Sequence, residues 1–180
     1  ENIDTNVSLT SGSFKYNSLD DRGISAETAK KYGVKVTFNT DGTIAKHAYP
    51  YYINNEVVTH KVRTTSDKGF AWTKPTKGIG LFGENLFSEG GKYVTIFEGE
   101  CDAMAGYEMM GSKWPSLSIR SGAGGAVRDI KDSLEYLESF DNILLCFDND
   151  KEGKKNAIKA AKILTPGKVK IVKLPTGIKD

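Results

Sequence analysis

The sequence contains few cysteines and histidines and has no long hydrophobic run. Its 180 residues include two histidines and two cysteines, and the cysteines, Cys101 and Cys146, form no CxxC pair. A zinc ribbon and a disulfide-stabilised scaffold are therefore excluded, and we expect two buried thiols in a protein of a reducing, cytoplasmic compartment. The apolar runs are as long as β-strands and far shorter than the roughly 20 residues of a membrane helix, so no membrane partner is expected.

The composition is that of a folded domain. Hydrophobic residues make up 38% of the chain and charged residues 27%, which excludes collagen, a coiled coil and a wholly disordered chain. The length suits one domain of good size or two small ones. No signal or transit peptide is recognisable, and the chain begins at Glu1 rather than at a methionine. We expect it to be an internal part of a longer protein.

The net charge is low, but the charges are unevenly distributed. Lysine and arginine number 25 against 23 acidic residues, a net charge of +2, which argues against coating nucleic acid by charge alone. Residues 151–179 nevertheless carry nine lysines against Glu152, and we expect at least half of these lysines to be a solvated helix face. Residues 57–82 carry five cations against one acid, interleaved with Phe70 and Trp72. That pattern fits either single-stranded nucleic acid binding or a hairpin with ordinary core aromatics.

The first half of the chain predicts a linker followed by a small sheet. Residues 1–17 are polar and lack periodicity, as a linker does. Ser25 can cap a short helix that ends at Gly33. Runs rich in valine and aromatics, separated by turn residues, then predict a mostly antiparallel sheet over 34–38, 47–53 and 57–63. We assign residues 18–90 to this α+β N-terminal subdomain and expect the glycine-rich stretch 69–83 to be a mobile loop.

The second half, residues 91–180, predicts an α/β domain with a parallel sheet flanked by helices. Apolar strands alternate with helical segments, and this alternation is typical of a parallel sheet covered on both faces. The expected strands are 92–100, 115–122, 142–150 and 168–175, and the expected helices are 101–111, 126–140 and 151–164.

Acidic residues gather where two of these strands end. Ligands bind beyond the carboxyl ends of parallel strands, so this position is informative. Side chains two residues apart in an extended strand point the same way, which would pair Asp148 with Asp150 and Glu98 with Glu100. Clustered carboxylates repel one another unless a cation neutralises them, and oxygen ligands without His or Cys favour Mg²⁺ over zinc or copper. Helix capping is the alternative explanation for a single DxD sequence.

A glycine-rich turn, Ser121 to Gly125, follows the second predicted strand and precedes a helix. Its backbone N–H groups could bind phosphate, and we include Arg120, Gly122 and Gly124 among the candidate nucleotide-binding residues. The turn matches neither GxGxxG nor the Walker sequence, so it predicts no motor site.

The second half resembles a Toprim domain, the catalytic fold shared by bacterial and phage primases and topoisomerases. The resemblance rests on the glutamate of VTIFEGECD and the DxD of LLCFDND, with the expected spacing between them. It extends into the first half, where SLDDRGISAET and VVTHKVR are similar to the primase domain of T-seven-type phage primase-helicases. Mitochondrial Twinkle helicases are similar too, although their animal members depart from the catalytic pattern.

The resemblance implies a DNA primase, a nucleotidyltransferase that uses NTPs and Mg²⁺ (or Mn²⁺) to make short RNA primers on single-stranded DNA. It implies catalytic roles for Glu98, Asp148 and Asp150, which would also be metal ligands together with the further acids Glu100, Asp102 and Asp180. It implies phosphate contacts for Arg22, Lys61, Arg63 and Lys68. The amino-terminal zinc-binding module and the carboxy-terminal helicase of the family are absent, and we expect them in the parent protein, in the cytoplasm of an infected cell if a phage encodes it.

Two other functions remain open. The chain could be a Toprim nuclease, or a degenerate Toprim module that binds DNA and supports a replicative helicase. Retention of Glu98, Asp148 and Asp150 argues against the degenerate module. The sequence does not decide whether Glu98 is a metal ligand or a general base.

Overall fold

The computed structural model describes residues 9, 13–67 and 69–178. The chain forms two compact units, residues 1–79 and 80–180, and each is described by itself. Of the sequence predictions, Lys68, Asp180 and most of the predicted linker lie outside the described residues.

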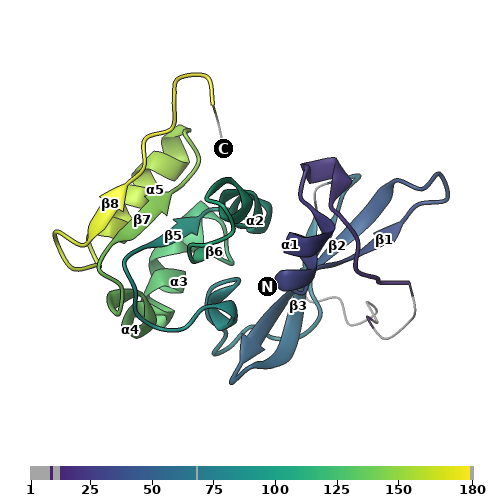
Figure 1. The fold of residues 1–180 in the computed structure, drawn as a ribbon, viewed down its shortest axis with the longest axis horizontal. Coiled ribbons are helices and arrows are strands. Elements are labelled where there is room, and N and C mark those ends of the chain that lie inside the picture. Colours follow the sequence, from purple (N-terminus) through teal and green to yellow (C-terminus); the bar gives the residue numbers. More distant parts are fainter. Residues whose placement is uncertain (1–8, 10–12, 68, 179–180) are drawn as a thin grey trace. The chain divides into compact units, whose positions relative to one another are not determined.

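The first unit is an antiparallel sheet preceded by a short helix. Its four strands lie in the order β1-β2-β3-β4 (Figure 1). The Ser25 hydroxyl accepts the Thr28 N–H at 3.2 Å and so caps the helix, as predicted. Asn54 and Asn55 both have positive φ and close the β2–β3 hairpin. The elements are η1 (Asp20–Arg22), α1 (Ala26–Lys31), β1 (Lys35–Phe38), β2 (Ile44–Ile53), β3 (Glu56–Thr64) and β4 (Phe70–Trp72).

The second unit is built on a parallel sheet with the order β6-β5-β7-β8. The chain leaves central strand β5 for β6 on one side and returns to β7 on the other. This reversal creates a topological switch point at the carboxyl end of β5. The elements are η2 (Glu84–Leu86), β5 (Val94–Phe97), α2 (Glu100–Met109), β6 (Ser116–Ser118), η3 (Ala123–Gly125), α3 (Ala126–Asp132), α4 (Leu134–Glu138), β7 (Ile143–Cys146), α5 (Lys151–Ala161) and β8 (Val169–Ile171).

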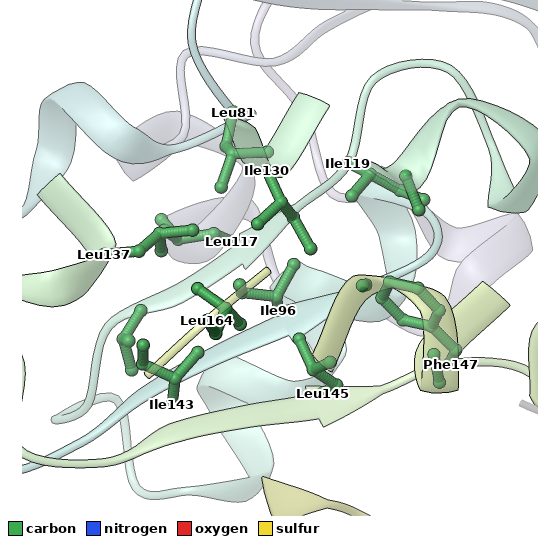
Figure 2. Close-up of a cluster of buried hydrophobic side chains, with 14 of the residues drawn as sticks. Leu81, Ile96, Leu117, Ile119, Ile130, Leu137, Ile143, Leu145, Phe147 and Leu164 are labelled. Atoms are coloured by element: carbon green, nitrogen blue, oxygen red, sulfur yellow. The ribbon is translucent and has the colours of Figure 1, made fainter. Parts of the chain in front are cut away.

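The core of this unit lies between the sheet and helices α3, α4 and α5 (Figure 2). Ile96 and Leu145 contribute from the two central strands, and Ile130 and Leu137 contribute from the helices, all fully buried. On the other face of the sheet, Gly106 of α2 lies against the ring of Phe97. Strand side chains therefore pack against helices on both faces, as the apolar runs predicted.

Along the chain, the boundary between the two units lies between Ile79 and Gly80 rather than at residue 90. The segment after Gly80 joins the second unit because Leu81 lies in its core and Phe82 pairs with Ser118 through two backbone hydrogen bonds of 3.0 and 3.2 Å. Residues 73–81 form a loop, as predicted, but Phe70–Trp72 form β4, and Ile79 within the loop is buried.

The predicted helix 126–140 is interrupted. Helix α3 ends before Ser133 and α4 begins after it. Ser133 donates its hydroxyl proton to the Glu84 carboxylate at 2.5 Å, which ties the interruption to the segment that enters the second unit. Periodicity of apolar residues could not predict this break, because Ile130 and Leu137 face the core on both sides of it. No helix in the described ranges is long and apolar enough to cross a membrane.

The close approach of α2 to β5 leads to a prediction. A Cβ at Gly106 would lie 2.2 Å from Cζ of Phe97. Gly106→Ala should therefore lower the free energy of unfolding by about 1–2 kcal/mol, because overpacking outweighs the gain of about 1 kcal/mol in helix propensity. Denaturant unfolding measures the loss. In a Phe97→Leu background the same change should be nearly neutral, and an equal loss in both backgrounds would contradict the contact.

Candidate active site

Glu98 lies at the switch point, one residue beyond β5. Strands β6 and β7 flank β5, so their carboxyl ends lie on either side of this side chain. The Glu98 carboxylate is held from both sides. It accepts the backbone N–H of Asp148, which follows β7, at 3.3 Å, and a backbone hydrogen bond from Ala123, which follows β6. A single carboxylate thus connects the ends of three strands.

Glu98 has a raised pKa because the site is partly buried and acidic. Burial is the largest cause, and the negative charge of Asp148 is the next. The charge of Asp150 adds to the rise, while the two backbone hydrogen bonds oppose it. Because the charges of Asp148 and Asp150 both act on Glu98, the fold brings the three predicted catalytic acids near one another.

Asp148 and Asp150 differ in their surroundings. Asp150 caps helix α5, because its Oδ1 accepts the Gly153 N–H at 2.8 Å. A Cβ at Gly153 would lie 2.3 Å from the carbonyl oxygen of Asp148, so glycine is required for α5 to begin this close to the strand end. Helix capping, the alternative explanation of the DxD, is therefore present at Asp150. It coexists with the electrostatic coupling to Glu98.

The other predicted acids are placed less uniformly. Glu100 is 4% exposed and begins α2, so the extended conformation that would have aligned it with Glu98 ends before it. Asp102 is in the first turn of α2, and its charge and that of Asp148 both act on the thiol of Cys146. Burial, and then these two charges, raise the pKa of that thiol. Asp102 and Asp148 therefore both lie near enough to Cys146 for their charges to act on its thiol.

The donor set fits a hard divalent cation. Among the described residues 9, 13–67 and 69–178, no group of three or more His, Cys, Asp or Glu side chains is arranged to hold a metal ion by itself. Mg²⁺ commonly uses only one or two carboxylates and completes its coordination with water and substrate phosphate. Carboxylates that raise the pKa of Glu98 offer the excess negative charge that such an ion neutralises. Glu98, Asp148 and Asp150 are the residues that would hold it.

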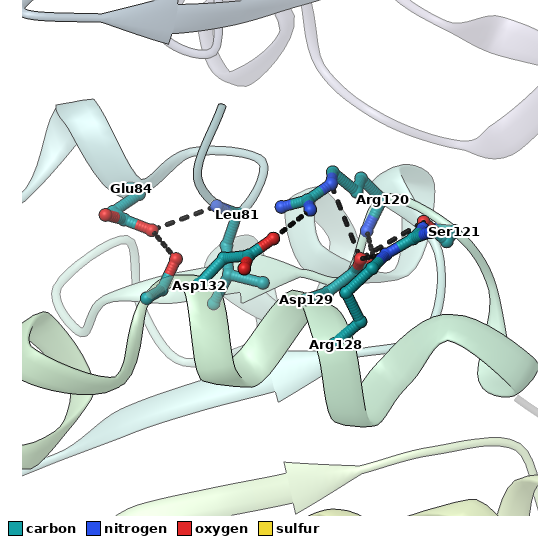
Figure 3. A network of polar contacts seen from close by, with 8 residues as sticks. Leu81, Glu84, Arg120, Ser121, Arg128, Asp129 and Asp132 are labelled. Carbon is teal, nitrogen blue, oxygen red and sulfur yellow. Dashed lines mark hydrogen bonds and ion pairs between the residues drawn. The ribbon is translucent and has the colours of Figure 1, made fainter. Parts of the chain in front are cut away.

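The glycine-rich turn is anchored by an ion-pair network that the sequence did not predict (Figure 3). Arg120 is 6% exposed, and its guanidinium pairs with Asp129 and with Asp132. These contacts are internal to the domain, so the nucleotide-binding role of Arg120 stays a prediction. Gly122 has φ +67° and ψ 178°, a conformation that only glycine adopts readily, and Gly124 lies in the following turn η3.

Two of the predicted basic residues of the first unit, Lys61 and Arg63, lie on β3. Lys61 and Arg63 point to the same face, since they are two residues apart, and both lie over Phe70, with Lys61 Nζ 4.5 Å and Arg63 Cζ 5.9 Å from the ring centroid. Phe70 is 43% exposed, whereas Trp72 packs on buried Tyr51 with ring centroids 5.0 Å apart. The aromatics interleaved with cations thus divide into one exposed ring and one packed ring. Arg22 ends the turn η1 in the same unit.

Two residues of the second unit were missed by sequence reasoning. Asp129 is fully buried and anchors the glycine-rich turn, but a lone aspartate in a helix gives no signal of burial. Asn149 donates its side-chain amide to the carbonyls of Pro175 and Ile178, at 3.3 and 3.0 Å. It thereby fastens the segment after β8 to the loop between Asp148 and Asp150. The sequence signal that could have identified Asn149 is its position between Asp148 and Asp150.

A known protein of similar sequence comes from a phage. A family model described as Toprim-like matches residues 95–180. The DNA helicase/primase of Enterobacteria phage T3 is 37% identical over 161 residues, which are 89% of this chain and 28% of that protein. The chain therefore spans little more than a quarter of the length of that relative.

Two solved structures with the same fold come from bacteriophage T7. The crystal structure of the primase fragment of its primase-helicase matches with a TM-score of 0.84 and 34% identity, covering 98% of this chain and 72% of the other. A structure of the T7 lagging-strand DNA polymerase interacting with primase domains of two gp4 subunits, bound to an RNA/DNA hybrid and dTTP, matches with a TM-score of 0.84 and 34% identity over 97% and 87% of the two chains. The predicted fold class is confirmed.

Mutual repulsion of the acids leads to a prediction about pH. The pKa of Glu98 is raised in the folded chain, so ionised Glu98 costs stability above the usual pKa of 4.5. Asp148→Asn removes one cause of that rise. At pH 7, without divalent metal, it should raise Tm by about 1–2 °C, a few tenths of a kcal/mol for a half-exposed group.

The gain should fade as the pH falls through the raised pKa of Glu98 and should be absent well below 4.5, where Glu98 is protonated in both the folded and the unfolded state. Carbon NMR titration of the Glu98 carboxyl should show its pKa lower in the variant. Asp132→Asn, which removes an acid outside the cluster, is the matched control and should leave that pKa unchanged. An unchanged pKa in Asp148→Asn would contradict the coupling.

Proposed function

The chain belongs to the family of Toprim-type primase domains of phage primase-helicases, and we propose that it synthesises short RNA primers on single-stranded DNA from NTPs. The observation that carries the proposal is the convergence of Glu98, Asp148 and Asp150 at the switch point of the parallel sheet. The site's excess negative charge suits a metal-dependent nucleotidyl transfer.

The acids would hold divalent metal, Mg²⁺ or Mn²⁺. When bound, the metal supplies charge stabilisation for the attacking ribose 3′-hydroxyl and the departing pyrophosphate. Asp150 is oriented by its capping bond to Gly153, and Glu98 by the two backbone amides. Glu98 is also placed to accept the proton of the 3′-hydroxyl, since its raised pKa makes it a better base than an ordinary carboxylate. Glu100, Asp102 and Asp180 remain proposed as supporting acids.

The basic face of β3 would bind the template or the triphosphate. Lys61 and Arg63 present cations beside the exposed ring of Phe70, and a ring and a cation together suit a base and its phosphate. Arg22, Lys68, Gly122 and Gly124 are further proposed contacts. A zinc-binding module and a helicase in the parent protein, acting in the cytoplasm of an infected cell, are proposed from the phage relatives.

Primer synthesis on single-stranded DNA tests the catalytic roles. Glu98→Gln and Asp148→Asn should each lower the rate at least about 100-fold, which corresponds to about 2.7 kcal/mol of lost transition-state stabilisation. Asp150→Asn should lose activity comparably while keeping the stability of α5, because asparagine caps helices as well as aspartate does. The readout is labelled primer formed from NTPs with Mg²⁺ or Mn²⁺.

The matched control is Glu152→Gln, an exposed acid in the first turn of α5, which should stay within about twofold of the parent rate. Primer synthesis that persists in Glu98→Gln and Asp148→Asn would refute the assignment. Cleavage of labelled DNA with metal but without NTPs would instead favour a nuclease. A calorimetric titration without divalent-metal binding would favour a non-catalytic DNA-binding module.

A further inference from the structure

Asp129 is a fully buried carboxylate with an unusually large set of donors around it (Figure 3). Its Oδ2 accepts the backbone N–H groups of Arg120 and Ser121, at 2.9 and 2.8 Å. Its Oδ1 accepts the Ser121 hydroxyl at 3.1 Å and lies 3.4 Å from Nε of Arg120 and 3.5 Å from Nε of Arg128. Helix α3 thus directs one negative charge at Arg120 and Ser121, shortly after the end of β6.

The turn that Asp129 anchors is tight. The Gly125 N–H donates to the Gly122 carbonyl at 3.0 Å, and a Cβ at Gly125 would lie 2.3 Å from that of Ser121. The Arg128 guanidinium also donates to the Ser121 hydroxyl, at 2.5 Å. With its start held by Asp129 and its end folded back on its start, the turn has little freedom to move between these points.

The backbone N–H of Ala123 lies within this turn and bonds to the Glu98 carboxylate. It is two residues beyond Ser121, the last residue whose N–H Asp129 holds. A chain of contacts therefore runs from Asp129 to the turn, from the turn to the Ala123 N–H, and from there to Glu98. None of these contacts depends on the first unit of the chain.

We propose that Asp129 is a positioning residue, which sets the orientation of the Glu98 carboxylate through the Ser121–Gly125 turn. The inference rests on the proposed function, because Glu98 is there the metal-binding and catalytic acid. Residues that orient metal-binding side chains typically change metal affinity or activity about 10–100-fold when they are replaced. The same contacts explain the burial of Arg120, whose charge is matched by Asp129 and Asp132.

The test compares four variants with the parent chain. Asp129→Ala removes every contact to the turn, but it leaves a buried guanidinium, so Arg120→Met/Asp129→Ala is made as well and should fold because no unpaired buried charge remains. Asp129→Asn keeps an oxygen for the two backbone N–H groups. Asp132→Asn is the control, since Asp132 pairs with Arg120 without touching the turn.

Two readouts need neither NTP nor template. Amide exchange of Ala123, followed by NMR, should be at least about 10-fold faster in Asp129→Ala and in the double variant. Mn²⁺ affinity, measured by calorimetry, should fall about 10-fold in the same proteins. Asp129→Asn should recover most of both losses, and Asp132→Asn should match the parent.

The proposal is overturned if the folded double variant keeps the Ala123 exchange rate and the Mn²⁺ affinity of the parent chain. It is also overturned if Asp132→Asn lowers them as much as removal of Asp129 does, since the effect would then be general destabilisation. Primer synthesis is measured separately. Its absence from the parent chain would refute the proposed function, whereas an unchanged Ala123 exchange would refute the role of Asp129 alone.

Discussion

The candidate site of the second unit depends on one carboxylate, Glu98, which lies where the carboxyl ends of three strands converge. Glu98 accepts N–H groups from the residues that follow β6 and β7, so the two neighbours of β5 are joined through a side chain beyond the point where their own pairing ends. That arrangement requires the switch in strand order, because only a central strand with neighbours on both sides presents its end to two loops. The topology of the sheet thereby determines where the acids can meet.

Two of the three acids, Glu98 and Asp150, have local hydrogen-bond donors. Asp150 is bonded to the first turn of α5 and Glu98 to two amides, and these bonds offset part of the repulsion between the charges. The remaining repulsion is visible in the raised pKa of Glu98. Backbone hydrogen bonds hold these side chains in place, and their negative charge is not fully compensated. The site can therefore bind a cation without rearranging.

Sequence patterns predicted the parallel sheet, the antiparallel sheet and the acids at the strand ends, because apolar periodicity and turn residues are local signals. They did not predict the interruption at Ser133 or the division after Ile79. Both depend on the segment that contains Leu81 and Glu84, which packs against residues far away in the sequence. Contacts between residues far apart in the sequence produce no hydrophobic periodicity within the segment itself.

Sequence patterns also could not predict the ion pairs of Arg120, a candidate nucleotide-binding residue. The guanidinium of an arginine before a glycine-rich turn can point outward to solvent or inward to the domain. Which of the two it does depends on whether carboxylates lie within its reach. Asp129 and Asp132 lie three residues apart in the region of α3, on one helix face, and supply that partner. The Arg120 guanidinium is therefore paired within the domain, and its nucleotide-binding role stays a prediction. Lys61 and Arg63 of β3 instead lie over the exposed ring of Phe70.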